Sequence, residues 1–468
     1  MTAIEPLTPT PDQWFREGPP ARTAEPLLRT PPARRVVLDN GLTLIIVERR
    51  DLPLVTLSFA NRRARDAGPP EHRGLAALTA HAVAAHAARR ADAGSSAPEP
   101  DAAPSARSGS EVSVSASGTR FQTSTTAEGF ESALARLARL VRSTPSFDRE
   151  TLRIARRNLD LAIEHAQFRA SHAMRAAALR ELYGEGHPLT WSLIESGESL
   201  WHLGSAELAA FHRERYGPAE SALVVVGAVG AEATIEAARR AFAGWAANPP
   251  SAAQAPADPP AAPAPAARRR QIQAFRNGER RGYVLIAAPC VPLADPDGVL
   301  LDLLAAHVGR FGRSSLAAEL RHDTGTTYGW SAACEQRPDG GTFFVSADAD
   351  RERVGEVLGA LLRELHRVGE APLPAAELEL AKATLLASAA EKTLTNAGLA
   401  RRLALTHLAG WPPERDEGLE ARVNSITAEE LRAAARRVLG SARGVAVIGD
   451  PRLFPEQLAP FGSWRPAR

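Results

Sequence analysis

The sequence is short of several residue types, and each shortage excludes a class of protein. Cys290 and Cys334 are the only cysteines among 468 residues, so a disulfide framework or a cysteine-based metal site is not expected. They allow a single disulfide, but two half-buried thiols are the simpler expectation. No apolar run approaches the length of about eighteen residues that a membrane-spanning helix needs.

Neither sign of charge is in clear excess. Lysine and arginine total 56, aspartate and glutamate total 54, and the formal net charge is +2. Binding to nucleic acid or to an anionic membrane usually requires a basic excess, so neither partner is indicated. The amino terminus has no basic stretch followed by an apolar core, so it does not resemble a secretory signal. We therefore expect a cytoplasmic protein.

The chain is long enough for two domains, and a low-complexity segment near its midpoint suggests where they divide. Residues 247–270, "ANPPSAAQAPADPPAAPAPAARRR", have the Pro/Ala composition of an extended linker. Residues 1–34 are predicted to form an extended, proline-rich arm. This predicts an N-terminal half at 35–246 and a C-terminal half at 271–468.

Two 25-residue stretches show that the halves repeat one another. They are "SAELAAFHRERYGPAESALVVVGAV", which begins at Ser205, and "TAEELRAAARRVLGSARGVAVIGDP", which begins at Thr427. Each reads as a Ser/Thr N-cap, an amphipathic helix, and a β-branched strand that ends in glycine. The chain is therefore predicted to contain a duplicated unit.

Further pairs of segments support the duplication. The strand at 54–60 matches the one at 282–288, and the long helical region at 147–184 matches the one at 373–410. Residues 111–125, "EVSVSASGTRFQTST", alternate apolar and polar side chains as antiparallel strands do. The predicted fold class is α+β, with a mostly antiparallel sheet packed against helices in each half.

Three stretches in this order resemble a known family. They are "VVLDNGLTLIIVERRDLPLVTLSFA" (36–60), a Tyr-Gly-x-x-His-Pro segment within 181–227, and "SSLAAELRHDTGTTYGWSA" (314–332). The family is that of the insulinase/pitrilysin-like zinc peptidases, whose zinc helix carries the inverted motif His-x-x-Glu-His. The resemblance implies a clam-like chamber built from such duplicated chains.

The helix "GLAALTAHAVAAHA" (74–87) aligns with the family's zinc helix but lacks its ligands. In this register Ala77 takes the place of the first histidine and Ala80 that of the glutamate; only His81, the second histidine, remains. Two histidines on one helical face and a carboxylate that activates water are needed for the zinc chemistry. The resemblance therefore implies no metal and no cofactor bound by this chain. His86, five residues after His81, points about 140° away on a helix.

The family's third zinc ligand is also missing. Counting back from His187 places its glutamate near residues 161–163, and Glu164 is out of register. A relocated metal site would have to bring together His72, Glu164 and His165, which nothing in the sequence requires.

The second half keeps a different part of the family's chemistry. Arg321 and Tyr328, seven residues apart in "LRHDTGTTY", match an arginine and a tyrosine that steady the peptide and its tetrahedral intermediate at the zinc site. Gly325 between them is predicted to take the left-handed conformation that ends a helix. An arginine near a helix end and a tyrosine in a strand are also ordinary structural choices.

The resemblance favours one function and leaves two others open. In the favoured reading, this chain is the zinc-free subunit of a heterodimeric peptidase. A homologous partner holds zinc, and Arg321 and Tyr328 complete the site in trans on a peptide substrate. The alternative is a non-catalytic scaffold or peptide-binding subunit, in which the pair is structural. A self-sufficient hydrolase is the weakest reading, because no nucleophile elbow or P-loop occurs.

Overall fold

The computed structural model describes most of the chain. The described residues are 31–65, 72–94, 111–115, 117–142, 147–167, 170–184, 187, 190, 197–246, 271–276, 281–293, 295–309, 320, 325–327, 329–337, 340–411, 418–440 and 443–466. Most of the predicted arm and the whole of the predicted linker lie outside these ranges. The division of the chain into halves at 247–270 therefore stays a proposal.

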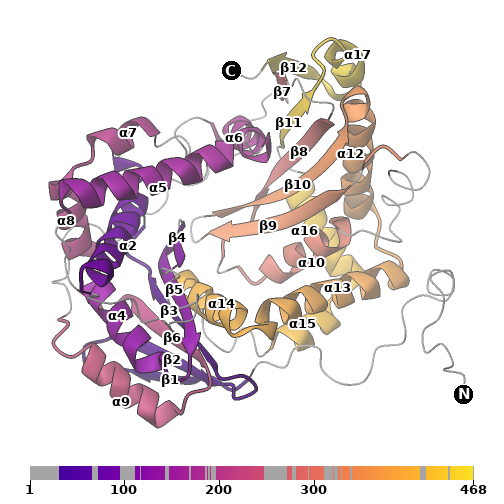
Figure 1. Cartoon of the computed structure of the whole chain (residues 1–468). Helices are drawn as coiled ribbons and strands as arrows, with labels where there is room; N and C mark the ends of the chain where they lie inside the picture. The colour runs from indigo at the N-terminus through magenta and orange to yellow at the C-terminus, as the bar shows by residue number, and fades with distance from the viewer. Residues whose placement is uncertain are drawn as a thin grey trace, which may run out of the picture.

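The strands form two six-stranded sheets with the same internal order (Figure 1). The first sheet has the order β1-β2-β6-β3-β5-β4, and the second has β12-β7-β11-β8-β10-β9. The first contains β1 (Arg34–Val37), β2 (Thr43–Glu48), β3 (Leu54–Asn61), β4 (Glu111–Ser115), β5 (Gly118–Thr126) and β6 (Ser221–Gly227). The second contains β7 (Gln271–Arg276), β8 (Arg281–Cys290), β9 (Trp330–Arg337), β10 (Gly340–Asp350), β11 (Gly444–Gly449) and β12 (Ser463–Pro466).

The repeated order confirms the duplication and the α+β class. A central strand of each sheet, β3 in the first and β8 in the second, pairs antiparallel with both of its neighbours. The predicted antiparallel pair at 111–125 is β4 with β5. Parallel pairing is confined to β2 with β6 and to β7 with β11 and β12. The halves differ at one edge, because β1 precedes its neighbour in the chain whereas β12 comes from the carboxyl end.

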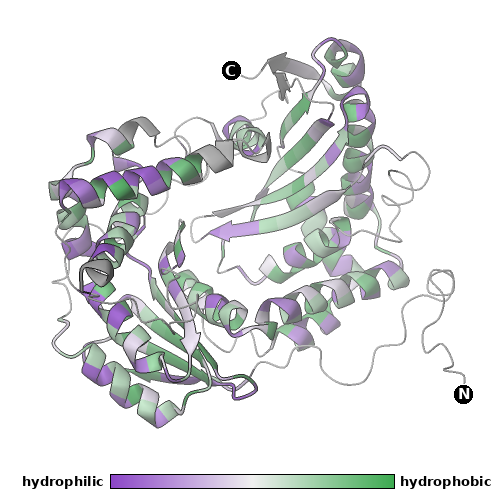
Figure 2. Cartoon of the chain, viewed as in Figure 1, coloured by the Kyte–Doolittle hydropathy of each residue, from purple (hydrophilic) through white to green (hydrophobic). Residues whose placement is uncertain are grey.

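Helices cover both faces of each sheet. The N-terminal half supplies α2 (Leu75–Gly94), α4 (Phe130–Arg142), α5 (Arg149–Gln167), α6 (Ala170–Tyr183), α7 (Gly197–His202), α8 (Ser205–Arg215) and α9 (Ala231–Ala241). The C-terminal half supplies α10 (Gly298–Val308), α12 (Val354–Glu370), α13 (Ala375–Leu394), α14 (Asn396–Ala409), α15 (Leu419–Ser425), α16 (Ala428–Leu439) and α17 (Phe454–Leu458). Figure 2 shows the apolar residues concentrated on the sheets and on the helix faces that contact them.

The two repeated stretches form the predicted helix and strand, but their helices begin differently. Thr427 caps α16 as predicted: its hydroxyl accepts from the amide of Glu430, whose carboxylate accepts from the amide of Thr427. The prediction that Ser205 caps α8 is wrong. Gly204 is the N-cap and Ser205 is the first helical residue, because its hydroxyl donates to the carbonyl of Phe147 instead.

One helix of each half packs on the sheet of the other half. Helix α6 follows α5 in the N-terminal half but packs on β8 and β11, where Met174, Ala178 and Tyr183 join a cluster with residues of the second sheet. Helix α14 follows α13 but packs on β3 and β6, where Leu399 and Leu403 join a cluster with residues of the first sheet. Figure 1 shows α5–α6 and α13–α14 as the two connections between the halves.

The contact of α6 with β11 is close because of one glycine. A Cβ on Gly444 would lie 2.0 Å from the carbonyl oxygen of Ala178, so no side chain could be placed there. Hydrogen bonds and an ion pair add to the apolar contact. The hydroxyl of Tyr183 donates to the carbonyl of Gly341 at 2.7 Å, and Arg175 pairs with Glu335. The exchange of helices therefore makes one continuous structure from the two repeats.

The expectation of two thiols is wrong. Cys290 at the end of β8 and Cys334 in β9 form a disulfide with Cα atoms 6.8 Å apart. Strand β10 lies between these two strands, and the bridge is accommodated beside Gly341, where a Cβ would lie 3.2 Å from the Cβ of Cys290. Both cysteines are half-buried, as predicted. Among the helices that the structure describes, none is long and apolar enough to cross a membrane.

Candidate functional site

Helix α2 carries the register of the family's zinc helix, and its centre is made of small apolar side chains. Ala77 is 2% exposed and Ala80 is fully buried, both within the core of the N-terminal half. His81 is half-buried, and burial lowers the pKa of its ring below the ordinary 6.5. His86 is also half-buried, and His72 is exposed before the helix begins.

These residues do not fit a zinc ion. Methyl groups stand where the first histidine and the glutamate of the motif would lie, so one imidazole is the single ligand that the motif positions offer. Within the described part of the chain, no group of three or more His, Cys, Asp or Glu side chains could hold a metal. The side chains of Glu164 and His165, at the end of α5, lie outside the described residues.

Arg321 and Tyr328, the predicted catalytic pair, also lie outside the described residues, but their neighbours are described. Leu320 directly precedes Arg321 and is buried in the core of the C-terminal half. Its carbonyl accepts hydrogen bonds from the amide of Thr326 at 2.9 Å and from its hydroxyl at 3.1 Å. Gly325 has a φ of +61°, the left-handed conformation that was predicted for it. Local hydrogen bonds therefore join Thr326 to Leu320, the described neighbours of the two candidate residues.

The residues on either side of Tyr328 are fastened to Asp348 in β10. The hydroxyl of Thr327 donates to the main-chain oxygen and to the carboxylate Oδ1 of Asp348, at 2.6 and 2.9 Å. The amide of Gly329 donates to the same Oδ1 at 2.7 Å, and the amide of Asp348 donates back to the carbonyl of Gly329. Arg281 pairs with the other carboxylate oxygen. One carboxylate therefore holds the side chain of Thr327 and the main chain of Gly329, on either side of position 328.

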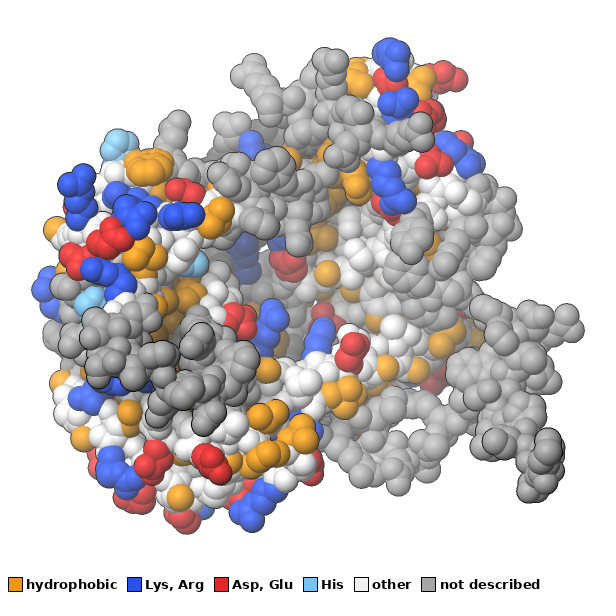
Figure 3. All heavy atoms as spheres, in the orientation of Figure 1, with side chains coloured by type: hydrophobic (Ala, Val, Ile, Leu, Met, Phe, Trp, Pro, Cys, Tyr) orange, Lys and Arg blue, Asp and Glu red, His pale blue; other side chains and the backbone are white. Residues whose placement is uncertain are grey.

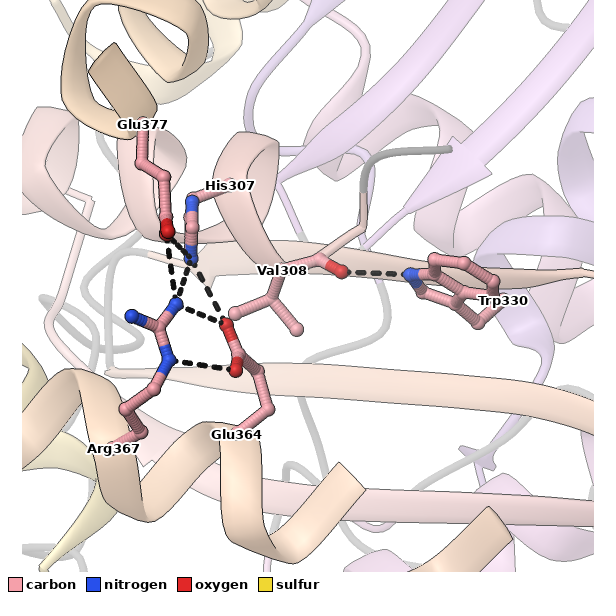
Figure 4. A network of polar contacts seen from close by, with 6 residues as sticks. All are labelled: His307, Val308, Trp330, Glu364, Arg367 and Glu377. Carbon is pink, nitrogen blue, oxygen red and sulfur yellow. Dashed lines mark hydrogen bonds and ion pairs between the residues drawn. The ribbon is translucent and has the colours of Figure 1, made fainter. Parts of the chain in front are cut away.

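A polar network joins helices α10, α12 and α13 (Figure 4). His307 of α10 and Glu364 of α12 are 4% and 5% exposed, and His307 Nε2 lies 3.0 Å from Glu364 Oε1. The guanidinium of Arg367 donates to both oxygens of Glu364, at 2.8 and 2.9 Å, and to Glu377 of α13 at 2.8 Å. These hydrogen bonds, first of all those to Glu364, raise the pKa of Arg367 further above its ordinary value. The network ties three helices together.

A hydrogen bond connects helix α10, which carries His307 of the network, to the start of strand β9. The indole of Trp330, the first residue of β9, donates to the carbonyl of Val308, which directly follows His307 (Figure 4). Its distance is 2.8 Å, and Trp330 is 3% exposed. Helix α10 is therefore held by α12 and α13 on one side and holds the start of β9 on the other.

The Tyr-Gly-x-x-His-Pro segment also has a defined position. The ring of Tyr183 stacks on that of His187, with centroids 4.9 Å apart, and its hydroxyl reaches the second sheet at Gly341. Burial raises the pKa of the Tyr183 hydroxyl to about 12. This tyrosine joins the two halves, so its described contacts are structural.

Sequence reasoning missed the residues that support the Arg/Tyr segment. Asp348, His307 and Glu364 stand far from Tyr328 in the chain, and none belongs to a recognisable motif. The available signal was weak: Asp348 is one of two aspartates near the end of the strand "GTFFVSADAD", and nothing in the sequence distinguishes it from Asp350.

The chain is similar to known proteins in sequence and in fold. The family model described as "Peptidase M16 inactive domain" matches residues 202–385. A protein of Streptomyces coelicolor named as an uncharacterised zinc protease is 27% identical over 254 residues, which are 53% of this chain and 54% of that protein. The match thus spans about half of that relative's length.

Two solved structures show the same fold. The M16 inactive domain of Pseudomonas fluorescens superposes with a TM-score of 0.73 over 93% of this chain and 100% of that one, at 18% identity. A chain of Complex III2 from Candida albicans gives a TM-score of 0.70 over 89% of this chain and 95% of that one, at 14% identity.

The structure has a duplicated α+β fold, and helix α2 has alanines at two of the three positions of the zinc motif that it resembles. The chain is similar to the M16 peptidase family: the inactive-domain model matches residues 202–385, and relatives of 24–27% identity are named as zinc proteases.

Proposed function

We propose that the chain is the zinc-free subunit of a heterodimeric peptidase. A homologous subunit supplies the zinc and the water-activating carboxylate, and this chain supplies Arg321 and Tyr328 to the same chamber. The substrate is a peptide. A guanidinium and a phenol near the scissile carbonyl would stabilise the negative charge that develops on its oxygen. Because each chain holds only part of the site, hydrolysis requires both.

The observation that carries the proposal is a difference between the two halves in how much of the family's site they contain. The motif positions on α2 are alanines, while the segment around Tyr328 is closed by the hydrogen bonds of Thr326, Thr327 and Gly329. A subunit acting in trans would need a well-held Arg/Tyr segment but no zinc ligands of its own, and the described neighbours of Tyr328 are held by hydrogen bonds while the motif positions on α2 are alanines. The zinc-protease name of the Streptomyces relative supports the reaction class.

Reconstitution tests the proposal. Peptide cleavage is measured for this chain alone, for a purified zinc-bearing homologue alone, and for the mixture, each with and without a chelator. We expect that only the mixture is active and that the chelator abolishes this activity. Activity of this chain by itself that the chelator removes would contradict the proposal.

The anchor can be tested separately from the pair. Replacing Asp348 by alanine removes the acceptor for Thr327 and Gly329, which costs about 1–2 kcal/mol and should lower the reconstituted activity roughly tenfold. Asp348→Asn keeps one carbonyl oxygen and should recover most of that loss. An exposed acid on the same half, Glu356, serves as the control, and its alanine variant should be fully active.

A scaffold or peptide-binding role is the second candidate. The similar chain of Complex III2 from Candida albicans shows that this fold also occurs in a structure that is named as a complex and not as a peptidase. In that case the partner would bind, the mixture would show no more cleavage than the zinc-bearing homologue alone, and Asp348→Ala would change stability without changing any activity.

A further inference from the structure

A pocket on the outer surface of the N-terminal half lies apart from α2 and from the Arg/Tyr segment. It lies between the exposed face of α5 and α7, and its volume is about 740 Å³. Its lining consists of Arg149, Glu150, Arg153, Arg156, Arg157, Asp160, Leu161 and Trp201. We call this pocket the arginine groove. Figure 3 shows arginine and apolar side chains gathered over this part of the surface, at the upper left.

The groove is lined by two more arginines than acidic residues. Four guanidiniums face two carboxylates, and Glu150 is already paired with Arg153. Among the described residues, neither Arg149 nor Arg157 is paired with a carboxylate. The excess positive charge is therefore located on two exposed side chains eight residues apart on α5, which is about two turns of the helix.

Two large apolar side chains lie among these charges. Trp201 is 63% exposed and Leu161 is 46% exposed. Leu161 is on the polar face of α5, opposite the buried Leu152 and Leu159. The guanidinium of Arg156 lies 5.6 Å from the centre of the Trp201 ring, and its Nη2 donates to the carbonyl of Leu203 at 2.7 Å. The indole is thus held in place, with much of its surface exposed to water.

We propose that the arginine groove binds an acidic segment of a partner protein that carries an apolar side chain between its carboxylates. The apolar side chain would cover Trp201 and Leu161, and the carboxylates would pair with Arg149 and Arg157. Tryptophan and arginine are the residues that most often carry binding energy at protein interfaces. A volume of this size suits a few residues of a tail or loop rather than a whole domain.

The groove does not suit a nucleic acid. Glu150 and Asp160 interrupt the positive surface, whereas a phosphate backbone needs a continuous one, and the net charge of the chain is only +2. A peptide can place its carboxylates beside the free arginines and its uncharged residues beside these acids.

The test uses the full chain and labelled synthetic peptides. One peptide has a phenylalanine flanked on each side by aspartates; the second replaces phenylalanine by alanine; the third replaces the aspartates by lysines. Fluorescence anisotropy should show binding of the first, at least tenfold weaker binding of the second, and none of the third. Raising the salt concentration should weaken binding of the first peptide, since its charge pairs are exposed.

Variants locate the site. Arg149→Gln with Arg157→Gln should weaken binding at least tenfold, and Trp201→Ala by a similar factor. The matched control changes two exposed arginines of α4, Arg136→Gln with Arg139→Gln, and should leave binding unchanged. Circular dichroism establishes that each variant is folded. As a second test, the double variant Arg149→Glu, Arg157→Glu should bind the lysine peptide instead of the aspartate peptide.

Several results would overturn the proposal. Equal binding of the aspartate and lysine peptides would remove the charge argument, and unchanged binding by the groove variants would place any site elsewhere. Tighter binding of a single-stranded oligonucleotide or of inorganic phosphate than of the aspartate peptide would show that the groove binds anions other than protein carboxylates. The outcome of this test does not depend on the proposed peptidase function.

Discussion

The two halves share their strand order, but each surrounds a buried histidine with a different kind of side chain. In the C-terminal half, His307 is surrounded by Glu364, Arg367 and Glu377. In the N-terminal half, His212 of α8 is 2% exposed, and neither ring nitrogen has a hydrogen-bond partner among the described residues. It is stacked on Tyr216 with centroids 4.4 Å apart.

The difference shows that the duplicated fold tolerates two solutions to the same problem. A buried imidazole can be kept neutral among aromatic rings, at the cost of its hydrogen bonds, or it can be built into an ionic network that joins helices. The N-terminal half, whose motif helix is made of alanines, uses the first solution. The C-terminal half, which holds the start of β9 through Trp330, uses the second.

Removing Glu364 should have the largest effect on stability. Glu364→Ala leaves the buried His307 and the half-buried Arg367 without their main partner, and we expect the free energy of unfolding to fall by about 3–5 kcal/mol. Urea denaturation followed by circular dichroism measures it. The exposed pair Glu356–Arg353 on the same helix is the control, since Glu356→Ala should cost less than about 1 kcal/mol. Equal losses from the two variants would mean that the network contributes no more than a surface ion pair.

The disulfide should also distinguish the halves, because both cysteines are in the second. Cys290 and Cys334 are 44 residues apart, and a loop of this length predicts a contribution of about 4 kcal/mol. Reductant should therefore lower the urea midpoint of the wild-type chain and leave that of the Cys290→Ser, Cys334→Ser variant unchanged. Titration of two free thiols in the unreduced native protein would contradict the bridge.

Acid should destabilise the N-terminal half through His212. Burial lowers the pKa of this ring to about 4, below the 6.5 of the unfolded chain. The unfolded chain therefore binds the proton more tightly. Stability is at its full value above pH 6.5 and is lost as the pH falls towards 4, by up to about 3 kcal/mol.

His212→Phe keeps an aromatic ring in the same position and removes the titration. Its free energy of unfolding should change less between pH 7 and pH 4 than that of the wild type, as measured by urea denaturation at each pH. Parallel pH profiles for the two proteins would show that His212 does not set the acid sensitivity.

The smallest effect is expected at His81 on α2. Its ring is half-buried and the motif around it supplies no second ligand, so His81→Ala should change the free energy of unfolding by about 1 kcal/mol or less. Zinc added at micromolar concentration should leave the melting temperature of the wild type unchanged. A rise in melting temperature with zinc that His81→Ala removes would show that a metal binds here after all.

The fold was largely predictable from the sequence because its periodic patterns are local. Helix α16 and strand β11 can be read from Thr427 onward, and their counterparts from residue 205, since apolar spacing and β-branched runs determine both. The exchange of α6 and α14 could not be predicted. An alanine-rich helix such as α6 has no feature that says which of two sheets it covers.

The candidate site was predictable only where a motif exists. The positions of Ala77, Ala80 and His81 and the Arg321–Tyr328 spacing follow from the family's pattern, but the residues that fix the segment do not. His307 and Glu364 are 57 residues apart, and Thr327, which precedes β9, is 21 residues from Asp348 of β10. The disulfide was missed for the same reason: its two strands are separated by β10, and strand order is not visible in a linear sequence.

The most direct test of the account is the activity of the reconstituted pair with Arg321→Ala, alongside its affinity for the zinc-bearing subunit. Arg436→Ala, at an exposed position of α16, is the control. The account predicts that kcat/KM falls by about 10²–10³ in the Arg321 variant, as expected for one lost transition-state donor, while the affinity between subunits is unchanged. Tyr328→Phe should behave similarly, with Tyr283→Phe as its control. Full activity in both the Arg321 and the Tyr328 variants would show that this chain takes no part in the chemistry.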